Sequence, residues 1–472
     1  MNSIVVGSGP NGLAAAITLA QAGCEVRVLE AQASTGGGAR SMELTLPGFV
    51  HDHCSAIHPL AAGSPFFRHL PLHLYGLEWV HSEYPLAHPL DDGTAAVLHR
   101  SVEATASAFG PDGTPYRHLM RPLVQHWEAL SDEFLQPLVH FPSHPLLLAR
   151  FGMQALRSAR GLSSRCFRSE AARALFAGLA AHSFLPLDAP GSAAMALVLA
   201  MFGHAVGWPL PRGGAQCISN ALTSLLRALG GTIQTRREVT SLGDLPDADA
   251  ILFDLTAWRA APLLHGHVSS RLEKRLASFP HGPSVFKVDY ALSAPIPWTA
   301  PECREAATVH LGGTFREIAA AEHDVTQGRL PERPFVLLAQ PTICDSTRAP
   351  EGSHIAWAYC HVPRGDTTDM KAAIEAQIER FAPGFRQTIL ARHVTRPADF
   401  EAANANLDGG DITGGAYDLW HLLVRPVFAL DPYRLGRTHL YLCSSSTPPG
   451  GGVHGMCGYW AAQSALGVMG LR

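Results

Sequence analysis

The sequence predicts an α/β fold built on a doubly wound parallel sheet, because strand, helix and strand patterns follow one another at its start. Residues 4–6 (IVV) are a short apolar run suited to a buried parallel strand, and residues 26–29 (VRVL) suit a second one. Residues 13–22 between them are rich in alanine and leucine, which favour helix, and Gly23 is placed to end that helix. A βαβ unit of this kind sets its two strands in one parallel sheet.

The turn after the first strand has the spacing G-x-G-x-x-G. Gly7 permits a tight turn, Gly9 lets a pyrophosphate approach the backbone, and Gly12 lets the helix pack closely on the sheet. The N–H groups and the dipole at the helix start favour an anion. Glu30 ends the second strand, where a carboxylate binds ribose hydroxyls and repels a 2′-phosphate. The segment therefore predicts a dinucleotide site, and leaves the choice between FAD and NAD open.

Size and composition narrow the class of protein. The chain has 472 residues, 47% of them hydrophobic, which suffices for a large core in two or three domains. A net charge of −4 provides no basic surface for nucleic acid. The nine cysteines form no C-x-x-C pair and the 25 histidines show no metal-ligand spacing. We expect a reduced, cytoplasmic protein with no metal, no disulfide framework and no redox-active dithiol.

The residues after the first βαβ unit predict a second contact with the cofactor and then a helical region. Gly37, Gly38 and Arg40 follow the acidic strand end and suit a second pass of backbone along the dinucleotide; a surface position is the alternative for Arg40. Residues 100–205 carry apolar residues at helical spacing. Residues 193–208 are too short to span a membrane. We interpret them as a buried helix, with an apolar tunnel wall or a membrane-touching face as alternatives.

The rest of the chain returns to the first sheet twice. The first return is predicted as a helix over 215–229 with strands over 232–236 and 250–255. Residues 280–400 differ, because they mix strands with a helix over 370–381. The second return is predicted at the end of the sequence, as a strand over 440–443, the segment TPPGGGVHGMCG and a helix over 459–469. The terminal glycines repeat the first spacing without a following strand and acid. We interpret them as a helix N-terminus that faces an electron-rich ligand edge, and predict one tightly bound dinucleotide.

These segments together resemble a known family. They are similar to the corresponding segments of the FAD-dependent phytoene (carotenoid) desaturase-like oxidoreductases, within the amine oxidase superfamily. The segments that carry the resemblance are GSGPNGLAAAITLAQAGCEVRVLEA, GGGARS, LPGFVHD and the terminal CSSSTPPGGGVHGMCGYWAA. The resemblance runs nearly end to end and includes PRGGAQCISNAL and SVFKVDYAL. It implies a discontinuous Rossmann-type FAD-binding domain of residues 1–60, 205–265 and 405–472. It also implies an α+β substrate-binding domain of residues 61–204 and 266–404, helical over about 100–204.

The resemblance also implies a cofactor site drawn from both ends of the chain. Glu30 would hold the ribose, Val239 would offer its backbone to the adenine, and Arg40 would lie near the phosphate or the flavin. The implied FAD-binding residues are Gly7, Gly9, Pro10, Asn11, Gly12, Glu30, Ala31, Gly37, Gly38, Arg40, Ala56, Ile57, Val239, Gly452, Val453 and Met456. The last three would begin the helix that faces the flavin pyrimidine edge.

The expected activity is the dehydrogenation of a small apolar substrate, of isoprenoid type, by hydride transfer to FAD. His454 and His58 are the candidate catalytic bases, and a structural role is the alternative for each. We expect Asp52 to bond backbone N–H groups or Arg40. An FAD-dependent amine or amino-acid oxidase and a non-catalytic flavin scaffold are the alternative functions. The electron acceptor is open between oxygen and quinone; peripheral membrane contact is left open, although no basic amphipathic helix is evident.

Overall fold

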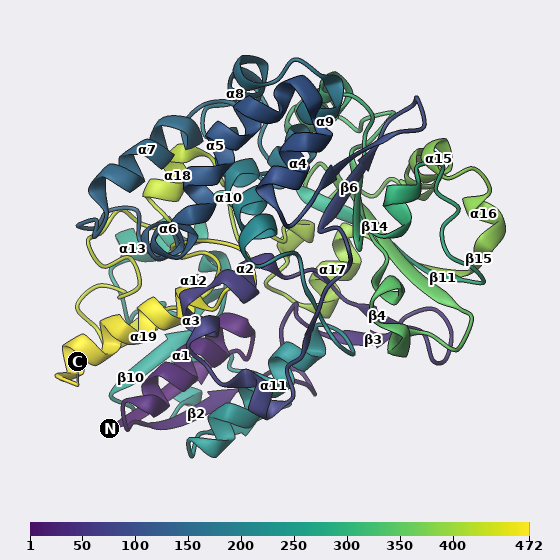
Figure 1. The fold of residues 1–472 in the computed structure, drawn as a ribbon. Coiled ribbons are helices and arrows are strands. Elements are labelled where there is room, and N and C mark those ends of the chain that lie inside the picture. The colour runs from purple at the N-terminus through teal and green to yellow at the C-terminus, as the bar shows by residue number, and fades with distance from the viewer. Residues whose placement is uncertain (472) are drawn as a thin grey trace.

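A five-stranded parallel sheet gathers the start, the middle and the end of the chain in the computed structural model, which describes residues 1–471. Its strands lie in the order β16-β10-β1-β2-β9, and every pair is parallel. The strands are β1 (Asn2–Val6), β2 (Glu25–Leu29), β9 (Thr232–Gln234), β10 (Ala250–Phe253) and β16 (Leu440–Leu442). The last strand of the chain therefore extends the sheet that the first strand begins (Figure 1).

Helices cover both faces of this sheet. The covering helices are α1 (Pro10–Gln21), α11 (Gln216–Ala228) and α19 (Met456–Met469) on one face, and α12 (Ala257–Leu263) and α13 (Ser270–Ala277) on the other. The alternation of side chains along β1 explains the two layers: Val5 packs with the first group, whereas Ile4 and Val6 pack with the second. The predicted doubly wound α/β fold is confirmed.

A seven-stranded mixed sheet forms the second core, in the order β15-β11-β14-β13-β12-β6-β7. Only the β12–β6 pair is parallel among these described strands. The strands are β6 (Leu86–Pro89), β7 (Ala95–Leu98), β11 (Ser284–Leu292), β12 (Thr308–Leu311), β13 (Val336–Ala339), β14 (His354–Val362) and β15 (Ile389–Thr395). Two small antiparallel sheets pair β3 (Ser41–Glu43) with β4 (Val50–Asp52) and β5 (Trp79–Val80) with β8 (Leu210–Pro211).

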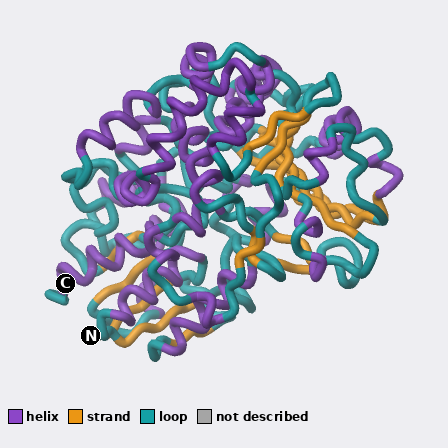
Figure 2. Tube along the Cα trace, in the orientation of Figure 1, coloured by secondary structure: helices purple, strands orange, loops and turns teal. Residues whose placement is uncertain are grey.

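A helical region lies beside the two sheets, as Figure 2 shows. It contains α4 (Val102–Ala108), α5 (Gly113–Gln125), α6 (Trp127–Phe134), α7 (Pro145–Ala155), α8 (Ala159–Cys166), α9 (Glu170–Ala181) and α10 (Ser192–Ala205). The other helices are α2 (Pro59–Gly63), α3 (Pro65–Arg68), α14 (Phe315–Thr326), α15 (Lys371–Phe381), α16 (Phe385–Thr388), α17 (Pro397–Ala403) and α18 (Leu419–Leu423). Within residues 1–471, no helix combines the length and the apolar character needed to cross a membrane.

Most predicted elements are present, and their ends shift by a few residues. The helices expected over 215–229 and 370–381 and the strands expected over 250–255 and 440–443 all form. The terminal helix begins at Met456, before its predicted start, because Gly455 adopts φ +71° and allows an earlier turn. The domain boundaries at residues 60, 205, 265 and 405 stay predictions, since strand pairing does not define where a domain ends.

Candidate functional site

A cavity of about 860 Å³ lies against the carboxyl ends of β1, β2 and β10 and extends to the second sheet. The carboxyl edge of a parallel sheet is where ligands bind in open α/β folds. Of the predicted residues, Gly7, Gly9, Pro10, Asn11, Glu30, Ala31, Gly37, Gly38, Arg40, Ala56, Ile57, His58, Val239, Gly452 and Val453 line this cavity. The structure thus brings the two ends of the chain to one cavity. Among residues 1–471, Gly12, Met456 and His454 lie outside its wall.

The glycine turn is shaped around a carboxylate that the sequence analysis did not single out. Asp254 follows β10, lines the cavity and accepts a hydrogen bond from the Gly12 N–H through Oδ2 at 3.0 Å. A Cβ atom at Gly9 would lie 2.5 Å from Asp254 Oδ2, and one at Gly12 would lie 2.3 Å from the Gly7 carbonyl oxygen. Side chains at these glycines would therefore fill the turn, where backbone and ligand must approach one another.

Asp254 should make the stability of the ligand-free protein depend on pH. Burial raises the pKa of Asp254 to about 7, with the Glu30 carboxylate as a further cause. Because the unfolded chain loses this proton first, the free energy of unfolding should fall between about pH 4 and pH 7. We expect Asp254→Asn, which keeps the acceptor for Gly12, to raise the free energy of unfolding by about 1–2 kcal/mol at pH 8 and by little at pH 4.

Urea unfolding at several pH values measures this effect, with the exposed Asp247→Asn as the matched control. Parallel pH profiles of the wild type and Asp254→Asn would contradict a raised pKa at this position.

Glu30 lies at the predicted position at the end of β2, and its carboxylate is held by the backbone. Oε2 accepts hydrogen bonds from the Ser8 N–H at 2.9 Å and from the Ser8 hydroxyl at 2.5 Å, and Oε1 accepts one from the Gln32 N–H at 2.8 Å. The side chain is buried and belongs to the cavity wall. These bonds fix the orientation of the carboxylate beside the glycine turn. Oε1 accepts only one of these bonds and therefore has a second lone pair that a ribose hydroxyl can engage.

Arg40 is held between the glycine segment and α17. Its Nε donates to the Gly37 carbonyl oxygen at 2.7 Å and its Nη2 to the Ala403 carbonyl oxygen at 3.2 Å. The side chain is buried and lines the cavity, so the structure disagrees with the surface alternative. Arg40 makes no ion pair among the described residues, so no carboxylate compensates its positive charge at the cavity. Such a position suits a phosphate.

The C-terminal segment reaches the cavity through Gly452 and Val453, but His454 turns away from it. The His454 Nδ1 accepts a hydrogen bond from the Met456 N–H at 3.0 Å, and Nε2 lies 3.1 Å from the Gly450 carbonyl oxygen. Burial lowers the pKa of His454 to about 4. Both ring nitrogens are thus engaged by backbone, and the hypothesis that His454 is a catalytic base is corrected. The Met456 N–H is likewise used within the protein, so the helix start presents fewer free N–H groups than expected.

His58 differs from His454 because one of its ring nitrogens has no partner. The residue precedes α2, its backbone N–H donates to the Pro209 carbonyl oxygen at 2.9 Å, and its side chain lines the cavity. Within residues 1–471, Nε2 is buried without a hydrogen-bond partner. Burial lowers the pKa of His58 to about 4, so the ring is neutral at pH 7. The role of His58 as a catalytic base stays a prediction.

A buried ion network underlies the cavity and was only partly predicted. Asp52 accepts hydrogen bonds from the Ala215 N–H at 2.7 Å and from Arg348 Nη2 at 2.8 Å. The expected backbone contact is present, whereas Arg348 takes the place that was expected for Arg40. Lys287 donates to the Asp52 carbonyl oxygen at 2.7 Å and to both oxygens of Asp289 at 2.7 and 2.8 Å. The charges of Lys287 and Arg348 are therefore neutralised within the protein.

The second sheet supplies a mostly apolar wall. Alternate residues of neighbouring strands point to the same face, which is why Lys287, Trp357 and Tyr359 all border the cavity. The remaining wall residues in this part are Phe184, Met195, Leu199, Trp208, Val285, Thr308 and Leu337. Met195 and Leu199 belong to α10, so the predicted apolar segment is a buried helix that also forms part of the cavity wall.

A histidine pair in this wall also escaped the sequence analysis. His182 borders the cavity, and its Nε2 lies 3.0 Å from Nε2 of the fully buried His310 on β12. Burial lowers the pKa of His182 to about 3, so one neutral ring donates and the other accepts. The two residues stand 128 positions apart, and no spacing in the sequence signals their contact.

Comparisons with known proteins agree with this site. Residues 5–70 match a family model described as an NAD(P)-binding Rossmann-like domain. The chain is 26% identical, over 98% of its length and 92% of the relative, to pyridine nucleotide-disulfide oxidoreductase domain-containing protein 2 of Mus musculus. It is 25% identical, over 100% of its length and 99% of the relative, to phytoene desaturase (lycopene-forming) of Pseudescherichia vulneris. Its fold matches cyclohexylamine oxidase of Brevibacterium oxydans with a TM-score of 0.61 at 16% identity, covering 99% of both chains.

The fold and the nucleotide cavity, together with these relatives, define an oxidoreductase with a flavin cofactor. Within that class, the chain is similar in sequence over its full length to phytoene desaturases, and it shares its fold with solved amine oxidases.

Proposed function

We propose that the chain binds FAD and dehydrogenates a neutral, apolar substrate of isoprenoid type by hydride transfer to the flavin. The observation that carries the proposal is the shared cavity, which joins a dinucleotide cradle to an apolar wall. The relative named as phytoene desaturase (lycopene-forming) supports the reaction type.

The cavity wall fits FAD in its chemistry. Gly7, Gly9 and the start of α1 suit the pyrophosphate, Glu30 suits the ribose, and Arg40 offers a cation to the phosphates. Asn11 Oδ1 is buried without a partner among the described residues, and it lies in the same part of the wall. Residues 56–57 and 452–453 are available to the flavin ring. When bound, FAD would accept a hydride from the substrate.

The charges of the cavity wall favour a neutral substrate over an amine. Lys287 is paired with Asp289, so the part of the wall on the second sheet offers no free cation to a substrate carboxylate. The carboxylates of the described wall are Glu30, Glu238 and Asp254, which all follow strands or loops of the nucleotide sheet. A cationic amine would therefore find no carboxylate along the second sheet. An apolar enclosure also excludes water from the reacting atoms.

Flavin retention tests the cofactor assignment. We expect Glu30→Ala to raise the dissociation constant for FAD at least tenfold, because charge-assisted hydrogen bonding to the ribose is lost. Titration of the apoprotein with FAD, followed by flavin fluorescence, measures the constant. Glu25→Ala, at the exposed start of the same strand, is the matched control and should bind FAD like the wild type. Equal binding by Glu30→Ala would remove Glu30 from the ribose role.

Anaerobic reduction of the bound flavin tests the substrate class. A panel of neutral polyenes, amines and amino acids is mixed with the oxidised holoprotein, and bleaching of the flavin spectrum is recorded. Neutral apolar compounds should reduce the flavin. Reduction by an amine alone would overturn the proposal in favour of an amine oxidase.

A further inference from the structure

The apolar wall of the second sheet contains polar atoms that the fold leaves without partners. Within residues 1–471, Trp357 Nε1 and Thr308 Oγ1 are buried and have no hydrogen-bond partner. Both residues line the cavity and are only 3% and 1% exposed. Because an unpaired buried N–H or hydroxyl costs free energy, such groups are normally paired with protein, water or ligand. The wall therefore offers hydrogen bonds that a pure hydrocarbon cannot use.

The strand register places these two residues in one row of the sheet. Thr308 of β12 stands opposite Ala339 of β13, and Ala339 stands opposite Trp357 of β14. Residues in such a row point to the same face, and two strand spacings, about 10 Å, separate the outer two backbones. The Trp357 indole is also held in place by the Tyr359 ring, with the two centroids 5.5 Å apart and the planes at 16°. One polar group of a ligand fits between two side chains at this spacing.

A third hydrogen-bond donor adjoins this row through His310. His310 stands two positions after Thr308 on β12, so the two side chains point to the same face. Its Nδ1 is buried without a partner in the described chain, and its Nε2 lies 3.0 Å from His182 Nε2. A proton on Nδ1 would leave a buried N–H unpaired, so His310 carries its proton on Nε2 and donates it to His182. His182 then holds its own proton on Nδ1 and is a neutral donor in the cavity wall.

We propose that the substrate carries a carbonyl oxygen, which the donor row of Thr308, Trp357 and His182 binds. The inference rests on the proposed function, because it narrows the neutral apolar substrate to a ketone or an aldehyde. An indole N–H can only donate, so the group that it binds must accept. A carboxylate suits the donor row less well, since all three donors are neutral and Lys287 is already paired with Asp289. A hydroxyl suits it less well too, because only Thr308 among the three could accept the hydroxyl proton.

Matched ligands test the carbonyl assignment on the oxidised holoprotein. The probes are farnesylacetone, which is a linear isoprenoid ketone, its secondary alcohol, and the hydrocarbon that has a CH2 group in place of the carbonyl. Each is added from the same cyclodextrin complex, and the change in flavin absorbance gives its dissociation constant. We expect the ketone to bind at least tenfold more tightly than the hydrocarbon, because the hydrocarbon leaves the buried donors unpaired.

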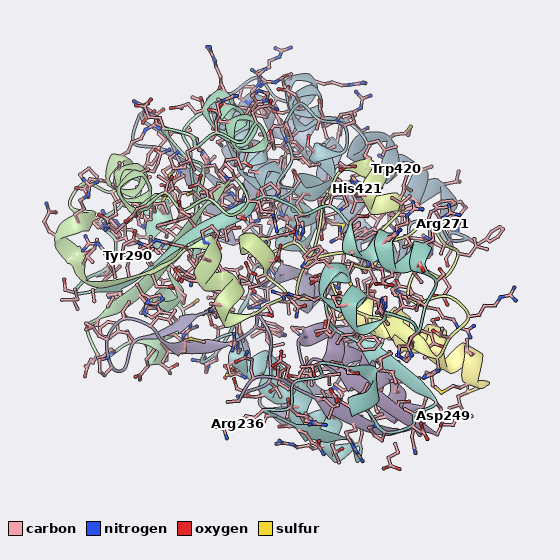
Figure 3. The ribbon with its side chains drawn as sticks, turned by 180° about the vertical axis from the view of Figure 1, so that it is seen from behind. Arg236, Asp249, Arg271, Tyr290, Trp420 and His421 are labelled. Carbon is pink, nitrogen blue, oxygen red and sulfur yellow. The ribbon has the colours of Figure 1, made fainter. Side chains whose placement is uncertain are left out.

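Two variants remove the donors with little change of shape. Trp357→Phe and Thr308→Val should each lower the preference for the ketone at least threefold, and the double variant should abolish it. Because Thr308→Val is nearly isosteric, it serves as the test should Trp357→Phe fail to fold. The matched controls are Trp420→Phe and Thr367→Val, which change exposed residues outside the cavity wall and should keep the wild-type preference. Figure 3 shows Trp420 on α18, far across the molecule from Tyr290 of the second sheet.

The infrared spectrum of the bound ketone reports the hydrogen bond directly. With a carbon-13 label in the carbonyl group, its stretching band should move to lower wavenumber in the wild-type complex than in an apolar solvent. In Thr308→Val/Trp357→Phe the band should return toward its position in the apolar solvent. An effect of the variants on packing alone would not move this band.

Three outcomes would disprove the carbonyl assignment and leave the proposed dehydrogenation standing. They are equal binding of ketone and hydrocarbon, tighter binding of the alcohol than of the ketone, and a changed dissociation constant for FAD in variants that keep the preference for the ketone. The last outcome would assign the donor row to a carbonyl of the flavin. Binding of an amine, with none of the three neutral probes bound, would disprove this inference and the proposed function together.

Discussion

Gly458→Val should lower the free energy of unfolding by at least about 3 kcal/mol and abolish flavin retention. Gly458 lies in the first turn of α19, where that helix crosses α1. A Cβ atom at this position would lie 1.8 Å from the Asn11 carbonyl oxygen and 2.9 Å from the Ala15 nitrogen. Both atoms are backbone, so the clash cannot be relieved by a side-chain rotation. The two helices must separate, and α1 then moves from the glycine turn.

Two measurements test the expected loss of stability and of flavin retention in Gly458→Val. Urea unfolding reports the stability, and the flavin absorbance of the purified protein reports retention. Gly467→Ala is the matched control, because Gly467 is an exposed residue of the same helix; it should leave stability unchanged or raise it by about 0.5–1 kcal/mol. Wild-type stability and flavin content in Gly458→Val would show that the contact between α1 and α19 does not support the cofactor site.

The local part of this site could be predicted from the sequence. Gly7, Gly9 and Glu30 occupy the expected positions because strand, turn and helix are determined by neighbouring residues, and the spacing alone sets their order. The C-terminal glycines were predicted to reach the same cofactor, and Gly452 and Val453 do line the cavity. The residue at which the following helix α19 begins was not predicted, because it depends on the left-handed conformation of Gly455.

The long-range polar contacts could not be predicted in the same way. Asp254 bonds Gly12 across 242 positions, and Arg348 bonds Asp52 across 296 positions. A buried polar group must find a partner, but the sequence does not say which of many candidates the tertiary fold delivers. One signal was present in SVFKVDYAL: Lys287 and Asp289 stand two apart in an apolar strand, so they share a face. A charged pair on a buried face indicates a network.

Asp52→Ala should lower the free energy of unfolding by about 3–5 kcal/mol. The Asp52 side chain is fully buried, and besides Ala215 and Arg348 it accepts a hydrogen bond from the Ser41 hydroxyl at 2.7 Å. Arg348 is also buried, so the variant leaves a cation without its carboxylate. Asp188→Ala, which breaks the exposed pair with Arg160, is the control and should cost less than about 1 kcal/mol.

The network also predicts an acid sensitivity. Burial alone would raise the pKa of Asp52, but the Arg348 charge and the hydrogen bonds from Ala215 and Ser41 lower it overall. Its contribution to stability is therefore present above about pH 4 and is lost as the pH falls through the lowered pKa of the folded state. Asp52→Ala should lack this part of the acid-induced loss. Urea unfolding between pH 3 and pH 7 compares the two proteins.

The double variant Asp52→Ala/Arg348→Met separates the two causes of the loss. If the stranded charge of Arg348 dominates, replacing that residue by an apolar one of similar length should restore more than about 1 kcal/mol relative to Asp52→Ala. If the lost hydrogen bonds to Ala215 and Ser41 dominate, the double variant should be no more stable than the single one. We expect restoration, because a buried guanidinium without a carboxylate costs more than an unpaired backbone N–H and an unpaired hydroxyl.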